Sequence, residues 1–299
     1  MSDQPFAVPP VTAPPQPAAR RGVLTQLWLH LLVEPWDRID ARDKGQPRVG
    51  KVSARAAAVW TAVVASLMLT VLRFVVMDHE VQTLFGQGVV RTAAALSPAL
   101  GRGLQPYQPL LVNLAWVVGC LTCYVAIPAL VVKRVFGLTL ADSYLAPREY
   151  LKHLPIYALL FAPVGLLVLL VARAPEFQQQ YPFFTSQVGS GAQIAWEVGY
   201  GLQFFALEFF FRGFILRGLA AEMGATAVLA MAIPYCMIHF GKPLPECLGS
   251  IIAGIVLGTL AMDTRSIWGG VTIHVAVAWL MDGAALLQKA KMAVALGGP

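Results

Sequence analysis

Apolar residues form long stretches of the chain, and short polar segments separate them. The candidate spans are about 56–77, 108–132, 154–172, 192–216, 225–240, 247–262 and 267–287, and 85–100 is a weaker apolar stretch. A helix crosses hydrocarbon with about 20 mostly apolar residues, because it satisfies its own backbone hydrogen bonds where water is absent. The pattern therefore predicts an all-α fold, a polytopic transmembrane helical bundle of about seven to eight spans.

Composition agrees with this pattern. The 299 residues are 57% hydrophobic and 13% charged, which is more apolar surface than one water-soluble core can hide. Cys120 and Cys123 form a CxxC pair in an apolar stretch, without a second pair or a nearby histidine to complete a zinc site. We therefore interpret the cysteines as small core residues.

The beginning of the chain differs from the rest. Residues 1–20 are rich in Pro and Ala with almost no charge, which predicts a disordered tail. Residues 21–55 predict an interfacial helix, over about 22–36, followed by a basic juxtamembrane segment. Eight of the 22 Lys and Arg lie between residues 20 and 55, just before the first span. This placement predicts a cytoplasmic N-terminus, and it explains the net charge of +6 without nucleic-acid binding.

Ionisable residues gather in the last spans. Glu197, Glu208 and Arg212 lie in 192–216, His239 ends the next span, and His274 lies in the last. Each charged side chain at bilayer depth costs about 2.5–3.5 kcal/mol, so each is a candidate for function. We therefore divide the chain into N-terminal transmembrane helices over 56–189, a catalytic core over 190–290 and a tail over 291–299.

Glu208 and Arg212 are four residues apart and share one helix face, where they can neutralise each other. Glu197 lies about three turns earlier, roughly 16 Å along nearly the same stripe. A structural ion pair that locks two helices is the alternative interpretation. His239 and His274 have no obvious local acceptor, and a neutral imidazole can transfer a proton or bind a metal.

Three spaced motifs occur in order over residues 190–287. They are Leu207-Glu208 with Arg212, Tyr235 with His239, and His274 with Ala278. In this order and spacing the chain resembles the CAAX prenyl protease and bacteriocin-processing (CPBP) family of intramembrane proteases, whose motifs are EExxxR, FxxxH and HxxxN. Two positions depart from that pattern. Leu207 stands where the family has its water-activating glutamate, and Ala278 stands where it has Asn.

The resemblance implies an intramembrane endopeptidase that cleaves a membrane-anchored or lipidated polypeptide. Glu208, or a substituting carboxylate, would activate water together with His239, while His274 polarises the scissile carbonyl and Arg212 holds Glu208. Glu246 and Glu197 are the candidate substitutes, and capping of the helix over 247–262 is the alternative role for Glu246. His239, His274 and Glu208 could hold a divalent metal such as zinc, or the site could work without one.

The implied partners are the lipid bilayer and the protein substrate, with no nucleic acid, and the implied location is the bacterial inner (cytoplasmic) membrane. The loss of the motif Glu and Asn leaves a second hypothesis open, a catalytically inactive relative that binds a peptide or a partner protease. A transporter or channel would also explain buried charge. Its polar residues should follow a path through the membrane rather than gather in the last spans. We interpret Asp263, Thr264 and Arg265 as a turn between two spans.

Overall fold

The computed structural model describes residues 22, 26 and 29–295, without the side chains of residues 30, 31, 148, 149 and 293–295. The predicted tail over 1–20 and part of the predicted interfacial helix lie outside these residues. The described part is an all-α bundle apart from one short hairpin, β1 (Arg48–Val49) with β2 (Val52–Ser53). Six of its helical segments are long and apolar enough to cross a membrane, so the protein is an integral membrane protein.

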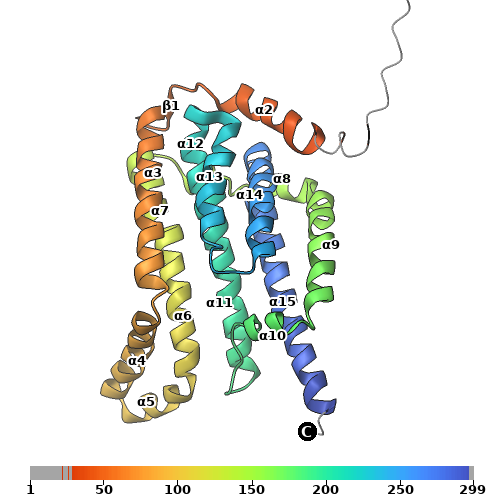
Figure 1. Ribbon diagram of the computed structural model, residues 1–299. Coiled ribbons are helices and arrows are strands. Elements are labelled where there is room, and N and C mark those ends of the chain that lie inside the picture. The colour runs from red at the N-terminus through yellow and green to blue at the C-terminus, as the bar shows by residue number, and fades with distance from the viewer. Residues whose placement is uncertain (1–21, 23–25, 27–28, 296–299) are drawn as a thin grey trace, which may run out of the picture.

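The N-terminal half supplies the outer helices of the bundle (Figure 1). Its elements are η1 (Leu29–Val33), α2 (Glu34–Asp43), α3 (Ala54–Val71), η2 (Leu72–Val76), α4 (His79–Leu96), α5 (Pro98–Leu104), η3 (Gln105–Tyr107), α6 (Gln108–Leu121), η4 (Thr122–Ala126), α7 (Ile127–Leu130), η5 (Val131–Phe136), η6 (Leu140–Ser143), α8 (Pro147–Lys152), α9 (Leu154–Val171) and α10 (Pro175–Gln180). Ser53 caps α3 by accepting a hydrogen bond from the backbone N–H of Ala56.

The C-terminal half carries the motif residues on helices that pack against one another. Its elements are α11 (Ser190–Glu208), η7 (Phe209–Ile215), α12 (Leu216–Met223), η8 (Gly224–Thr226), α13 (Ala227–Met237), α14 (Leu244–Thr264) and α15 (Trp268–Ala295). α13 packs on α14, and α11 packs on α15. The segment η7 is π-helical, a wider winding that is frequent at functional sites.

The six apolar segments contain the seven spans expected from sequence. The segment Ser190–Met237 holds 192–216 and most of 225–240, whose last three residues lie beyond the helix, and the two parts meet at Gly224, where φ is +57°. The weaker stretch 85–100 is divided between α4 and α5, and neither helix is one of the six. The last helix also runs beyond the expected end at 287, to Ala295.

The best-buried part of the bundle surrounds η7. Phe209, Phe210, Phe211 and Phe214 are at most 1% exposed, and the last three pack on Tyr124 and Phe136 from the N-terminal half. Burial of an aromatic side chain stabilises a fold strongly, so this cluster holds the two halves together. The motif positions in η7 and at the end of α11 are consequently held within this buried cluster.

The helix α2 lies across one end of the bundle (Figure 1). Arg38 forms an ion pair with Asp263 at 2.6 Å, and Arg265 forms one with Asp43. Trp36 donates a hydrogen bond to Thr259 at 2.9 Å, on α14. Asp263 and Thr264, which the sequence predicted to lie in a turn, are the last two residues of α14, and only Arg265 lies beyond that helix. Asp263 and Arg265 therefore also anchor α2. That role depends on residues more than 200 positions away, which local sequence does not reveal.

Candidate active site

The buried ion pair between Glu208 and Arg212 is the centre of the candidate site. Both side chains are 0% exposed, and Arg212 Nη1 lies 3.1 Å from Glu208 Oε1. The four-residue spacing places them on one face where α11 continues into η7. The contact is a close charge pair without hydrogen-bond geometry, so attraction between charges rather than a directed bond joins the two groups.

His274 on α15 approaches this pair from the neighbouring helix. Its Nδ1 lies 2.9 Å from Glu208 Oε1, and the side chain is 17% exposed. The same Nδ1 donates a hydrogen bond to the backbone carbonyl of Gly270 at 3.0 Å. Because a carbonyl oxygen can only accept a hydrogen bond, Nδ1 carries the proton, and its contact with Glu208 Oε1 is one between charged or polar groups. A local acceptor therefore exists one turn earlier in the helix, although none was evident in the sequence.

Gly270 is required by the close approach of α15 to Glu208. A Cβ atom at this position would lie 2.2 Å from Glu208 Oε2, inside any possible contact distance. Glycine is the residue that permits such an approach. The Gly269-Gly270 pair one turn before His274 is the signal for this position in the sequence, and it was not among the predicted site residues.

Tyr235 on α13 connects the remaining groups. Its hydroxyl lies 2.8 Å from His274 Nε2, and the Arg212 guanidinium carbon lies 4.1 Å from the centre of its ring. A cation over an aromatic face is attracted to the ring's negative charge density. Tyr235 is 1% exposed. In the sequence Tyr235 is evident only as part of a motif, in the position where the family has Phe.

His239 lies two residues beyond α13, at the edge of this group. Its Nδ1 is 2.9 Å from the carbonyl oxygen of Tyr235, and its ring centre is 5.0 Å from the Tyr235 ring. Nδ1 therefore donates to that carbonyl, and the Nε2 lone pair remains for other contacts. Burial lowers the pKa of His239 to about 4, so the ring is neutral at pH 7.

The other expected residues lie apart from the group formed by Glu208, Arg212, Tyr235 and His274. In the described part of the structure neither Glu197 nor Glu246 has an ion pair or hydrogen bond with that group. Glu197 accepts a hydrogen bond from Gln193 at 2.9 Å, and Glu246 forms an ion pair with Lys242 at 3.3 Å. Glu246 stands in the first turn of α14, where its charge favours the helix N-terminus, as in the capping interpretation.

The two departures from the family pattern are apolar and buried. Leu207 is 6% exposed and belongs to the cluster around η7, whereas Ala278 is 3% exposed and packs near Trp196 and Tyr200. Neither side chain can transfer a proton or donate a hydrogen bond. Any chemistry at this site must therefore come from its other residues.

The site residues do not fit a metal ion. Zinc sites use three or four His, Cys, Asp or Glu ligands, and the described residues bring no group of three such side chains together. In His274, Nδ1 and Nε2 are both engaged by protein groups. We therefore derive no step through a metal.

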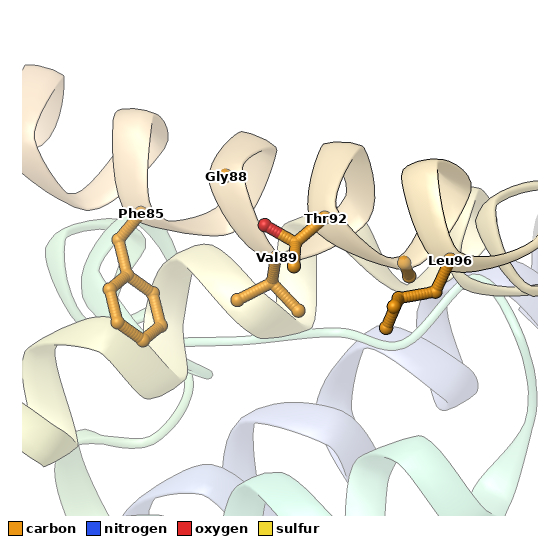
Figure 2. A pocket seen from close by; sticks show the side chains of 6 residues that line it. Phe85, Gly88, Val89, Thr92 and Leu96 are labelled. Atoms are coloured by element: carbon orange, nitrogen blue, oxygen red, sulfur yellow. The ribbon is translucent and has the colours of Figure 1, made fainter.

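Two open hollows on the surface are separate from this site. One, of about 530 Å³, is lined from one side of α4 by Phe85, Gly88, Val89, Thr92, Ala93 and Leu96 (Figure 2). The other, of about 510 Å³, lies near Pro47 and Ala221 at the end of the bundle that carries α2. Neither is lined by a motif residue, and the first has no titratable side chain in its lining.

Comparison with known proteins identifies the segment that contains the motifs. Residues 194–280 match the family model described as type II CAAX prenyl endopeptidase Rce1-like. Neither a curated protein nor a solved structure matches the chain. The matched segment contains Glu208, Arg212, Tyr235, His239 and His274, the residues that approach one another in the structure. The region from 194 to 280 is therefore similar to the Rce1-like family of type II CAAX prenyl endopeptidases.

Proposed function

We propose that this protein is an intramembrane endopeptidase that cleaves a membrane-anchored or lipidated polypeptide. The observation that carries the proposal is the chain of close contacts from Glu208 through His274 to Tyr235, at 2.9 and 2.8 Å, within the matched segment. A buried charge, an imidazole and a hydroxyl that contact one another in this order can stabilise charge that develops in a transition state. The family description favours a prenylated substrate, and the apolar surroundings favour one presented from the bilayer.

The contacts favour a different division of roles from that expected for Glu208. Its carboxylate is fully buried, is paired with Arg212 and His274, and has Gly270 against Oε2. A base must contact the attacking water, and Arg212, His274 and Gly270 already surround the two oxygens of Glu208. Glu208 and Arg212 therefore act as positioning residues that hold the His274 ring.

His239 is the base in this proposal. Its neutral Nε2 takes a proton from water while the water oxygen forms a bond to the scissile carbonyl carbon and the carbonyl electron pair moves onto oxygen. The same proton then passes to the leaving nitrogen as the carbon–nitrogen bond breaks. The group formed by His274 and its partners stabilises the negative oxygen in between.

The test uses the full-length protein in lipid nanodiscs and a library of membrane-anchored peptides, half of them farnesylated. We expect cleavage by the wild type, and a loss of at least 100-fold in His239→Ala and in His274→Ala. An excess of a zinc chelator should leave the rate unchanged. Absence of cleavage across the whole library, prenylated and unprenylated, would refute the protease function.

The two departures give specific support to a second candidate, a catalytically inactive relative that binds a peptide or a partner protease. Leu207 and Ala278 remove the proton-transfer and amide groups of the family motifs. The Leu207→Glu variant separates the candidates. A gain of cleavage from a silent wild type identifies an inactive relative, whereas an enzyme with another base is harmed or unaffected.

Orientation in the membrane is part of the proposal. The basic segment before α3 favours a cytoplasmic N-terminus in a bacterial inner membrane. Reporter fusions after residue 55 and after residue 295 test it, since an enzyme active only outside the cytoplasm should be silent when fused after residue 55.

A further inference from the structure

Tyr235 makes one contact that a phenylalanine could not make. A Phe in its position would still lie under Arg212 and beside His239, because those contacts use the ring. The contact with His274 Nε2 at 2.8 Å uses the hydroxyl. Tyr235 is therefore distinguished by one polar atom, and that atom points at the imidazole of the candidate site.

Of the N–H and O–H groups that His274 and Tyr235 carry, one donor remains for a substrate. Nδ1–H of His274 is directed to Gly270 and Glu208. When Nε2 is also protonated, next to the negative charge of Glu208, it donates to the phenol oxygen of Tyr235. Both N–H groups of the ring are then used within the protein. The phenol O–H remains, and its oxygen is polarised by the charged ring behind it.

We propose, on the basis of the protease function above, that Tyr235 is a catalytic residue whose hydroxyl donates the hydrogen bond that stabilises the oxyanion. His274 acts behind it, and Glu208 holds His274. The phenol keeps its proton throughout, so this contribution requires no bond to form or break on the protein. Tyr235 itself is 1% exposed, whereas 17% of the neighbouring His274 side chain is exposed, so the proposal places the approach of the substrate on the His274 side.

This role explains how the site tolerates Ala278. The family pattern places Phe at position 235 and Asn at position 278, so it has an amide donor on the last helix and none on α13. This chain has the reverse, a hydroxyl on α13 and a methyl group on α15. The donor has moved from one helix to another that faces the same imidazole.

The test compares Tyr235→Phe with the wild type on the peptide that the wild type cleaves best. Loss of one preorganised oxyanion donor lowers kcat by about 100- to 1000-fold. We expect this loss in kcat with KM changed less than threefold, because the hydroxyl acts in the transition state. Adding Ala278→Asn to Tyr235→Phe should recover at least tenfold in kcat.

Tyr144→Phe is the matched control. Tyr144 is also 1% exposed, and its hydroxyl has no hydrogen-bond partner among the residues that the structure describes. Its kcat should stay within threefold of the wild type. If Tyr235→Phe does not fold, replacement of Tyr235 by 3,5-difluorotyrosine keeps the shape and strengthens the donor, and kcat should rise at a pH where the phenol is protonated.

The outcomes separate this proposal from the protease function. A wild type that cleaves, together with an unchanged kcat in Tyr235→Phe or in the fluorinated protein, overturns the role of Tyr235 and leaves the protease intact. A kcat that falls without any recovery in the double variant overturns the exchange with position 278. A wild type that cleaves nothing refutes both.

Discussion

The helix α9 and the segment formed by α11, η7, α12 and α13 are both apolar, yet the structure uses them in opposite ways. In α9, 17% of the most apolar window is buried, whereas in the segment Ser190–Met237 the figure is 61%. Leu159, Leu166 and Leu170 of α9 are at least 60% exposed, so lipid covers them. The more polar of the two segments is the one buried in protein, because protein can pair its charges and lipid cannot.

The largest expected difference in stability between the two segments comes from the buried ion pair of Glu208 and Arg212. Replacing Arg212 with Leu leaves Glu208 as an uncompensated buried charge, which we expect to cost about 3–5 kcal/mol of stability. Thermal unfolding in detergent measures the loss. The control Leu166→Ala on α9 removes an exposed side chain and should change stability by less than about 0.5 kcal/mol. Equal effects of the two changes would show that the pair is not a structural centre.

Gly270 tests the close packing around that pair. A Cβ atom there would meet Glu208 Oε2 at 2.2 Å, so Gly270→Ala should destabilise the protein by about 1–3 kcal/mol and reduce cleavage. Gly283 lies on the same helix with nothing within 4 Å of its added Cβ. Gly283→Ala should be neutral or stabilise by up to about 1 kcal/mol. A tolerated Gly270→Ala would contradict the approach of α15 to Glu208.

Burial of His239 predicts that the stability of the protein depends on pH. Its pKa in the folded protein, about 4, lies below the ordinary value near 6.5. Between these two values the unfolded chain binds a proton that the folded chain does not, so stability is lost as the pH falls through this window. The unfolding temperature should therefore fall less from pH 6.5 to 4.5 in His239→Gln than in the wild type. Parallel curves would exclude this titration.

The same pKa predicts the acidic limb of activity. If neutral His239 is the base, kcat/KM should decline below about pH 5 rather than near 6.5. A decline centred at 6.5 would contradict the burial of the ring.

The smallest expected effect concerns the anchor of α2. Arg38 is 54% exposed and Asp263 is 15% exposed, so their ion pair is largely screened by solvent. Asp263→Asn should cost about 1 kcal/mol or less. A double-mutant cycle with Arg38→Gln measures the pair alone. A coupling as large as that of Glu208 with Arg212 would show that charge pairs at the end of the bundle and at its centre are equivalent.

The sequence by itself determined the fold class and the residues that carry the family motifs. Long apolar stretches can only be satisfied as helices in lipid, so the all-α membrane fold followed from composition and pattern. The pairing of Glu208 with Arg212 followed from their spacing on one helix. The sequence did not predict that the spans 192–216 and 225–240 join into one apolar segment, because periodicity does not mark where helices meet.

Only the tertiary structure decided which groups meet across helices. The hydroxyl of Tyr235 and the carboxylate of Glu208 reach His274 on α15 from α13 and α11. Glu197, on the same stripe as Glu208 by spacing, is instead joined to Gln193. Contacts between helices depend on their rotation and approach, which are set by packing over many residues. A single sequence therefore names the chemical groups of this site, and the packing of the helices selects their partners.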